Sequence, residues 1–435
     1  MYNEITNVIF IGGNMNYLSA GAKELKNELE ILKKEYLDFK NKNLSLNMAR
    51  GKPSKKQLDL SKDMLKNIDD DFEFSGVDIR NYGLLEGLPE ARKLMAGLMG
   101  CQPEETIVGG NSSLSLMHDV ITNFFIKGAN GCKPWSAQKI KFLCPCPGYD
   151  RHFQLCEFFG IDMIPIKLNH NGPDMEKIKE LTANDDSIKA IWCVPKYANP
   201  EGIVYSDEVI KKLSNLKPKA KDFKILWDNA YSVHDLYDEI KIANIFEECK
   251  KAGNQNMPIA FCSTSKITFA AGGISAIGCL GQNFVDMKNY FSRKIVCFDK
   301  INQARHVKFL KNLENIKFHM KKHAEILRPK FEFILKKFKE NFENNKILRW
   351  TNPKGGYFIS VYTYGSAKRV ESLCKEAGLV ITPAGAAYPY GKDPDDSNIR
   401  IAPSFPTLSE IEDAINLFCL CVKISSIEKI LENSN

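Results

Sequence analysis

The chain has 435 residues, 44% of them hydrophobic, and a formal net charge of +7. This length allows a large buried core in two or three domains. No stretch reaches the ~18 apolar residues of a membrane helix, and a modest positive charge spread over many lysines does not indicate nucleic acid. Thirteen scattered cysteines are typical of a reduced intracellular protein, so we expect a cytoplasmic location and neither a membrane nor a nucleic-acid partner.

The first half of the chain reads as an α/β pattern. Residues 1–14 look like a loose extension, and residues 20–42 form a charged amphipathic pattern that predicts a helix. From about residue 90, short apolar runs rich in Ile, Val, Phe and Trp alternate with helical stretches. Such runs predict parallel strands that helices cover on both faces, in a doubly wound α/β domain. The runs are KIKFLCPCP, DMIPIKL, IKAIWCVP, FKILWD and PIAFCST.

The second half predicts a smaller α+β domain. A long basic stretch, residues 303–346, is broken only by Pro329 and reads as one or two helices with a solvated face. His319 and His323 are four residues apart, but HMKKH lacks the glutamate of a zinc-protease motif, so we expect them on that solvated face. The strand-like segments GGYFISVYT and GLVITP follow, and then a closing helix over residues 408–424.

Two closely spaced cysteine pairs are candidates for metal ligands. Cys144 and Cys146 form a C-P-C step, and Cys419 and Cys421 form a C-L-C step. Neither pair has the two-residue gap of a zinc knuckle, so we expect buried thiols and no metal site.

Polar residues follow three of the predicted strands. Asn199 follows IWCVP, Asp228 and Tyr231 lie at the end of FKILW, and Lys266 follows PIAFC. Ligands of open α/β sheets bind at the carboxyl ends of the strands. A lysine behind a buried strand is desolvated, which favours the neutral, nucleophilic amine, and a nearby carboxylate can keep a pyridine nitrogen protonated. Together these are the groups that pyridoxal 5'-phosphate requires, although each residue alone reads as an ordinary surface or core residue.

A phosphate site is predicted less specifically. Residues 109–118 read GGNSSLSLMH, in which glycines and polar residues precede an apolar helical pattern. This predicts a helix start whose free N–H groups could bind phosphate. An ordinary capped helix explains the same pattern equally well.

These residues, in this order, resemble the class I and II aminotransferases, which belong to the fold-type I pyridoxal-phosphate enzymes. The resemblance runs from about Leu44 to Lys423. It is strongest to an aspartate aminotransferase-like branch that is related to the aminotransferase domains of MocR-type regulators. The segments that carry it are ARGKPS at 49–54, NYGLLEGLPEAR at 81–92, WDNAY at 227–231 and STSKIT at 263–268.

The resemblance implies a mostly parallel central sheet with helices on both faces and a smaller α+β domain. We expect residues 1–58 to form an N-terminal arm and part of the small domain. Residues 59–325 would form the large cofactor-binding domain, and residues 326–435 the small C-terminal domain.

The resemblance also implies catalytic and ring-binding roles. Lys266 would hold pyridoxal 5'-phosphate as a Schiff base and move the substrate proton. Asp228 would pair with the pyridine nitrogen, and Asn199 and Tyr231 would hydrogen-bond the ring hydroxyl oxygen. Tyr149, in PCPGYDRHF, would stack on the ring.

The cofactor phosphate would be bound by a further set of residues. Many members of the family carry a phosphate-binding arginine eight residues after the lysine, but here that position is Ile274. Tyr82 would reach the phosphate of a neighbouring subunit, which implies a homodimer. The remaining phosphate ligands implied by the resemblance are Asn111, Ser112, Ser113 and Ser263.

The substrates implied are an amino acid and a 2-oxo acid. Arg400, in NIRIAPSFP, would bind the substrate α-carboxylate with its planar guanidinium, and Gly51 would lie on a loop that closes over the substrate. Asn199 would also face the substrate. The branch favours L-aspartate with 2-oxoglutarate, and a dicarboxylate needs a second cation, for which Arg50 and Arg305 are candidates.

Three functional hypotheses follow. The first is an aminotransferase, with alanine or aromatic amino acids as alternative donors. The second is another pyridoxal-phosphate reaction, such as β-elimination. The third is a non-catalytic binding module, as in MocR-type regulators. Those regulators carry an N-terminal winged-helix domain. Only about forty residues precede ARGKPS here, which is too few for such a domain.

Overall fold

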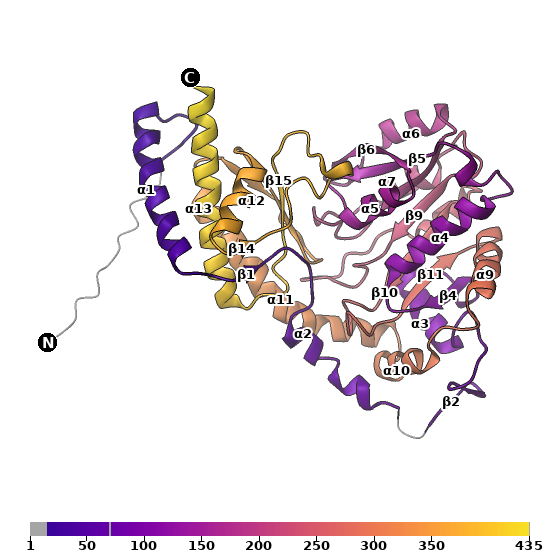
Figure 1. Cartoon of the computed structure of the whole chain (residues 1–435). Helices are drawn as coiled ribbons and strands as arrows, with labels where there is room; N and C mark the ends of the chain where they lie inside the picture. Colours follow the sequence, from indigo (N-terminus) through magenta and orange to yellow (C-terminus); the bar gives the residue numbers. More distant parts are fainter. Residues whose placement is uncertain (1–14, 69–70, 435) are drawn as a thin grey trace.

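The computed structural model describes residues 15–68 and 71–434, so the expected N-terminal extension lies outside the described residues. The larger part of the described chain surrounds one central sheet (Figure 1). Its strands are β4 (Thr106–Gly109), β5 (Lys141–Cys146), β6 (Asp162–Asn169), β7 (Gly172–Pro173), β8 (Ile188–Cys193), β9 (Lys224–Asp228), β10 (Pro258–Ser263) and β11 (Ser275–Cys279). Its helices are α3 (Pro89–Met99), α4 (Ser113–Lys127), α5 (Asp150–Phe158), α6 (Met175–Asn184), α7 (Asp207–Ser214), α8 (Ile245–Lys251), α9 (Gln282–Lys294) and α10 (Lys300–Leu310).

The central sheet is mostly parallel, as predicted. Its strand order is β4-β11-β10-β9-β8-β5-β6-β7. The neighbours from β10 to β6 pair in parallel, whereas β11 runs antiparallel to both β10 and β4, and β7 runs antiparallel to β6. All five apolar runs identified in the sequence form strands of this sheet.

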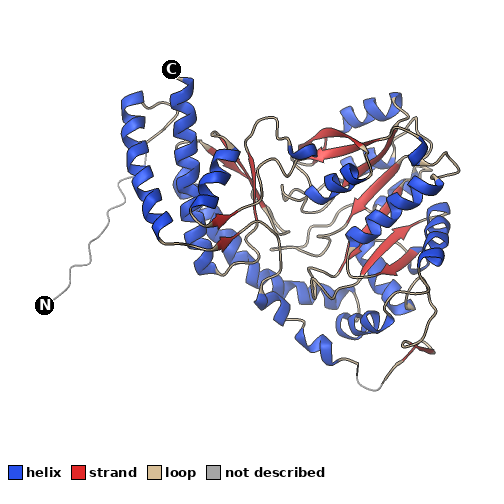
Figure 2. Ribbon diagram, viewed as in Figure 1, coloured by secondary structure: helices blue, strands red, loops and turns tan. Residues whose placement is uncertain are grey.

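Helices cover both faces of the central sheet (Figure 2). Successive strand residues alternate between two hydrophobic clusters: Leu226 belongs to one, and its neighbours Ile225 and Trp227 belong to the other. Helices α4, α5 and α9 contribute to the first cluster, and α3, α6, α7, α8 and α10 contribute to the second. Because both faces are buried, the strands read in the sequence as continuous apolar runs.

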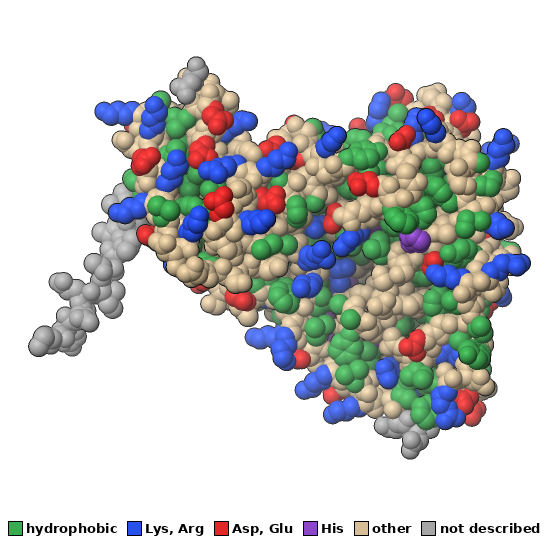
Figure 3. All heavy atoms as spheres, in the orientation of Figure 1, with side chains coloured by type: hydrophobic (Ala, Val, Ile, Leu, Met, Phe, Trp, Pro, Cys, Tyr) green, Lys and Arg blue, Asp and Glu red, His purple; other side chains and the backbone are tan. Residues whose placement is uncertain are grey.

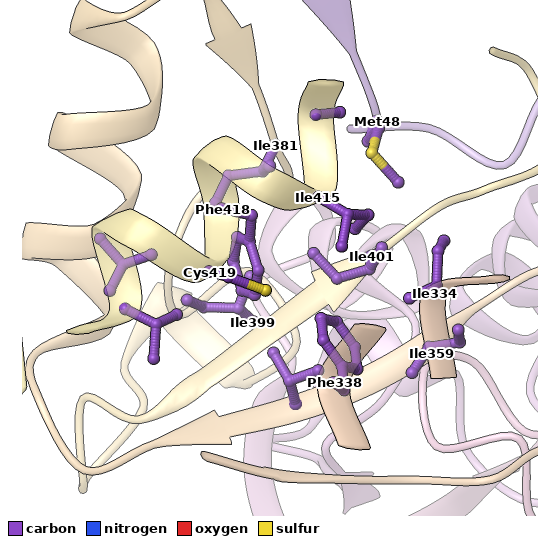
Figure 4. Packing of buried hydrophobic residues seen from close by; sticks show 14 of the residues in the cluster. Met48, Ile334, Phe338, Ile359, Ile381, Ile399, Ile401, Ile415, Phe418 and Cys419 are labelled. Atoms are coloured by element: carbon purple, nitrogen blue, oxygen red, sulfur yellow. The ribbon is translucent and has the colours of Figure 1, made fainter. Parts of the chain in front are cut away.

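The smaller part of the chain combines its N-terminal segment with its C-terminal third. Helix α1 packs against α13 (Figure 1), and β1 pairs in parallel with β14. An antiparallel sheet of order β12-β13-β15 lies beside them, and its apolar side chains pack with those of α11 and α13 (Figure 4). The elements are α1 (Ala22–Asn41), β1 (Leu46–Asn47), α2 (Lys55–Asp59), α11 (Leu313–Phe342), β12 (Leu348–Trp350), β13 (Ile359–Thr363), α12 (Ala367–Glu376), β14 (Leu379–Val380), β15 (Asn398–Ile401) and α13 (Leu408–Asn433).

The short strands β2 (Glu73–Phe74) and β3 (Val77–Asp78) form a hairpin, and 3-10 turns lie at residues 62–66, 103–105, 135–137 and 389–391. We propose the domain boundaries expected from the sequence with two qualifications. Residues 58 and 59 both lie within α2, so the first boundary falls inside a short helix. Residues 325 and 326 lie within α11, so a continuous helix joins the two parts of the chain.

The basic stretch at residues 303–346 forms two helices, α10 and α11, and Pro329 lies inside α11. The prediction that His319 and His323 lie on a solvated face is wrong, because they are only 7% and 1% exposed. They lie on the inward stripe of α11 together with Ile316 and Met320, and His319 Nε2 is 2.8 Å from the Ile267 carbonyl oxygen. The four-residue spacing of the two histidines places them on the same face of the helix, but it does not show whether that face is buried or exposed.

The surface charges and the helices of the structure bear on the expectations from the composition. Lysine and arginine side chains are interspersed with acidic ones on the face shown in Figure 3. None of the helices in the described part of the chain combines the length and the apolar character that a membrane span requires. The cysteines of the C-P-C and C-L-C steps are buried free thiols.

Candidate active site

Lys266 lies three residues after the end of β10 and is partly buried. Its Nζ atom is 5.0 Å from the centre of the Tyr231 ring and makes no hydrogen bond to the residues that the structure describes. Burial lowers the pKa of the amine, and the charge of Asp228 offsets only part of this effect. The arrangement therefore favours the neutral, nucleophilic amine that the sequence predicted.

Asp228 is the last residue of β9 and is buried. His152 Nε2 donates a hydrogen bond to Asp228 Oδ2 over 3.0 Å, and the imidazole stacks on Trp192 with a centroid distance of 4.1 Å and an interplanar angle of 6°. In the described chain Asp228 Oδ1 is buried without a hydrogen-bond partner. A buried carboxylate oxygen is costly to leave unpaired, so this atom fits a ligand that carries an N–H group, such as a protonated pyridine.

Two tyrosines lie beside this carboxylate. Tyr231 is buried, and burial raises the pKa of its hydroxyl group above the usual range. Tyr149 precedes α5, its ring is 5.0 Å from that of His152, and burial raises its pKa to about 12. Both hydroxyls therefore stay protonated near neutral pH and can donate hydrogen bonds.

Arg400 lies on β15 and links the smaller part of the chain to α5 and to the loop after β8. Its Nη1 atom donates to Asp150 Oδ1 over 2.8 Å and to Asn199 Oδ1 over 3.2 Å. Its Nε atom donates to Thr382 Oγ1 over 3.2 Å, and the guanidinium carbon lies 4.9 Å from the centre of the Phe358 ring. These contacts fix the plane of a guanidinium that is well suited to a carboxylate.

The loop around Gly51 lies against the same arginine network. Thr382 Oγ1, which accepts from Arg400, donates to the Ala49 carbonyl oxygen over 2.6 Å. A Cβ atom at Gly51 would lie 2.6 Å from Phe358 Cζ, which is too close for a side chain. A side chain here would therefore have to displace the buried Phe358 ring, which favours glycine at this position, and its neighbour Arg50 is exposed.

The predicted phosphate residues lie where the start of α4 meets the segment before Lys266. Ser265 Oγ donates to the Asn111 carbonyl oxygen over 3.0 Å, and Ser263 Oγ donates to Ser265 Oγ over 3.3 Å. Ser112 occupies the N-cap position of α4, which begins at Ser113, but its side chain makes no capping hydrogen bond. This hydroxyl and the first N–H groups of the helix are therefore available to an anion.

Two predicted residues are placed differently. Tyr82 makes none of these contacts, and its side chain is 78% exposed. Arg305 lines a cavity together with Gly110, Asn111 and Ile274, on the phosphate side of the site, and not with Arg400 or Gly51. Of the two candidates for a distal carboxylate, only Arg50 lies next to the loop that packs beside Arg400.

Sequence reasoning missed several residues that support the site. His152 lies three residues after Tyr149, one turn further along the predicted helix. This spacing places both side chains on one side of the helix and could have indicated that His152 also faces the site. Asp150, directly after Tyr149, carried a similar signal. Thr382 had none, because its role depends on contacts with Ala49 and Arg400 from distant parts of the chain.

Comparisons with known proteins agree on one family. A family model described as aspartate amino-transferase matches residues 20–434. An aspartate aminotransferase of Corynebacterium glutamicum is 40% identical over 405 residues, which cover 92% of this chain and 94% of that protein. The crystal structure of an aspartate transaminase from the same species is 38% identical, with a TM-score of 0.93 over 96% of this chain and all of that chain.

A more distant structure shows the same fold. The α-aminoadipate aminotransferase of Thermus thermophilus, complexed with N-(5'-phosphopyridoxyl)-L-leucine, is 17% identical. It superposes with a TM-score of 0.71 and covers 96% of this chain and 97% of that chain.

Proposed function

The chain belongs to the aspartate aminotransferase family and is a pyridoxal-phosphate-dependent aminotransferase, and we propose that it moves the amino group of L-aspartate to 2-oxoglutarate. The family that the sequence motifs predicted is thereby confirmed. The choice of substrates rests on the relatives named aspartate aminotransferase and on the placement of two arginines described below.

One observation carries the cofactor assignment for this chain. Asp228 has one oxygen bound to His152 and a second, buried oxygen without a partner, while the Lys266 amine nearby has no hydrogen bond in the described chain. These two incomplete groups fit the pyridine nitrogen and the aldehyde of pyridoxal 5'-phosphate. The bound cofactor supplies a protonated ring that withdraws electrons from the substrate Cα.

The residues of this chain would then act as follows. Lys266 removes the proton from the substrate Cα and returns a proton within the same site, for which its lowered pKa suits it. Asp228 accepts a hydrogen bond from the ring nitrogen and keeps that nitrogen protonated. Asn199 and Tyr231 bind the ring hydroxyl oxygen, and Tyr149 covers the ring.

Substrate binding is assigned to the arginine network. Arg400 would bind the α-carboxylate, because Asp150, Asn199 and Thr382 hold its guanidinium in one plane. Arg50 would bind the distal carboxylate of a dicarboxylic substrate when the Gly51 loop closes. Its exposed side chain makes no hydrogen bond or ion pair with other described residues, so it is free to reach a ligand.

A panel of amino donors with 2-oxoglutarate tests this proposal. We expect kcat/KM for L-aspartate to exceed the values for L-alanine and aromatic amino acids. Arg50→Gln should lower the value for aspartate by about 10-fold or more, with a much smaller effect on alanine, because only aspartate has a second carboxylate. Higher activity with alanine or aromatic donors would reject the substrate assignment. Release of pyruvate and ammonia from a single substrate would instead indicate β-elimination.

We also propose a homodimer and a cytoplasmic location. Tyr82 is 78% exposed, which suits a side chain that reaches the phosphate site of a second copy. All thirteen cysteines are free, which is typical of a reducing compartment. A monomeric mass in light scattering with full activity would contradict the shared site.

A further inference from the structure

Arg305, on α10, is a cation without a partner among the described residues. In residues 15–68 and 71–434 its guanidinium donates no hydrogen bond and takes part in no ion pair, and its Nε atom is buried. The side chain as a whole is half-buried, and leaving its buried Nε–H without an acceptor is costly, so such a donor normally has a partner. The described chain does not supply that partner, which points to a ligand.

The cavity beside Arg305 has a volume of about 320 Å³. The backbone that leads into α4, at Gly110 and Asn111, lines this cavity together with Asn302 and Arg305 of α10. Asn302, one turn before Arg305, donates hydrogen bonds of 3.1 and 3.0 Å to the carbonyl oxygens of Gly272 and Gly273. These bonds hold α10, and with it Arg305, against the loop that follows Lys266.

The charges around this cavity are few. Within residues 15–68 and 71–434, Arg305 is the only lysine or arginine that lines it, and Ile274 lines it without contributing charge. Among the described lining residues the acidic one is Asp299, whose carboxylate already caps α10 by accepting from the backbone N–H of Asn302 over 2.9 Å. The cavity thus has one free positive charge beside the N–H groups that precede and begin α4.

We propose that Arg305 binds the phosphate group of the cofactor and supplies from α10 the positive charge that is missing at Ile274. The inference rests on the proposed binding of pyridoxal 5'-phosphate at Lys266. A phosphate monoester carries a charge of about −1.5 to −2 at neutral pH, and a helix N-terminus offers only about +0.5. A guanidinium supplies a full charge and can donate two parallel hydrogen bonds to phosphate oxygens.

This assignment differs from a role in substrate binding. Arg305 shares its cavity with Gly110 and Asn111, whereas the residues proposed to bind substrate, Arg400 and Arg50, do not line it. A carboxylate from a second copy of the chain is the other anion that could pair with Arg305. The two alternatives predict different effects on cofactors with and without phosphate.

The test compares apoprotein affinities for pyridoxal 5'-phosphate and for pyridoxal, which lacks the phosphate. Arg305→Gln should weaken binding of the phosphorylated form by about 10- to 100-fold and leave the affinity for pyridoxal unchanged within about twofold. Lys308→Gln is the matched control: it removes one positive charge from the same helix, outside the cavity, and should change neither affinity. Arg305→Lys, which keeps the charge, should lie between wild type and Arg305→Gln.

A second measurement applies if Arg305→Gln does not fold. Inorganic phosphate should compete with pyridoxal 5'-phosphate for wild-type apoprotein, and more weakly for Arg305→Lys. Ile274→Arg, combined with Arg305→Lys, should raise the affinity for the phosphorylated cofactor again, because Ile274 lines the same cavity.

The outcomes separate this inference from the proposed function. Equal losses for both cofactors, or no loss for either, would overturn the role of Arg305 while leaving the enzyme assignment intact. Wild-type protein that binds neither form would overturn the proposed function itself. A loss of dimer without a change in the ratio of the two affinities would assign Arg305 to a carboxylate of the second copy.

Discussion

The two ends of strand β9 differ in how their buried charges are satisfied. Before the strand, Asp222 accepts from Lys189 Nζ over 2.8 Å with one oxygen and from Trp135 Nε1 over 2.8 Å with the other. At its first residue, Lys224 donates three hydrogen bonds, to Asn130 Oδ1, Asn283 Oδ1 and the Asn256 carbonyl oxygen. At this end both charged side chains are fully hydrogen-bonded within the described chain.

The carboxyl end of β9 is incomplete. Asp228 has a buried oxygen without a partner, and Lys266, close to it, has an amine without a hydrogen bond in the described chain. Both ends therefore contain a buried aspartate and a buried or partly buried lysine, but only at the carboxyl end do the charged side chains themselves lack hydrogen-bond partners in the described chain. Burial of charge alone does not indicate a site; burial with unsatisfied donors and acceptors does.

The strongest test of this difference replaces each of the two lysines, Lys266 and Lys224, in a separate variant. Lys266→Ala should abolish the visible absorption band of the bound cofactor and lower kcat for transamination by roughly 10³-fold or more, because no other amine lies in the cluster to move the Cα proton. Its midpoint of thermal unfolding, measured on apoprotein, should change little, since the amine makes no hydrogen bond.

Lys224→Met is the matched variant at the other end. We expect it to keep the absorption band and most of the activity but to lose stability, because three acceptors lose their donor. An unchanged cofactor spectrum in Lys266→Ala would break the comparison.

The two aspartates provide a second, smaller test. Asp228→Asn should lower kcat by about 10²- to 10³-fold, because a neutral amide does not hold a pyridine nitrogen protonated. Asp222→Asn should leave kcat nearly unchanged and lower the free energy of unfolding by about 3 kcal/mol, since it leaves the buried Lys189 ammonium without a counter-charge. Steady-state kinetics and urea unfolding of both variants measure the two effects. A similar loss of kcat in both would show that the ends are not functionally distinct.

Sequence reasoning reached the carboxyl end of β9 because its signals are local. Each strand of the parallel sheet is buried on both faces, so its end is marked by the step from apolar residues to Asp228 or to the segment before Lys266. Strands β4 and β11 were not predicted individually, because the first is only four residues long and the second contains Ser275 and Gly278.

Contacts between distant segments explain what the sequence could not predict. The hydrogen bond from Arg400 to Thr382, the position of Arg305 beside Asn111, and the inward face of His319 all depend on how separate elements pack. Periodicity shows that a helix has two faces, but it does not show which other segment will cover a particular histidine.

The smallest predicted effect is a pH dependence at the amino end of β9. Burial lowers the pKa of Lys224 to about 8, against an ordinary value of 10.5. Below pH 8 the ammonium is present in both the folded and the unfolded chain, so the cost of burying it is paid in full. Between pH 8 and 10.5 the unfolded chain binds more protons than the folded one, so the free energy of unfolding rises with pH.

Relative to Lys224→Met, which does not titrate at this position, the wild-type free energy of unfolding should therefore increase by roughly 2 to 3 kcal/mol from pH 7.5 to 10, at about 1.4 kcal/mol per pKa unit. Urea unfolding of both proteins across this range measures the difference and cancels the titration of tyrosines and cysteines that the two share. A constant difference would mean that Lys224 keeps its ordinary pKa when folded. The three hydrogen bonds would then stabilise the ammonium as well as water does, and the contrast with Lys266 would lie in hydrogen bonding and not in desolvation.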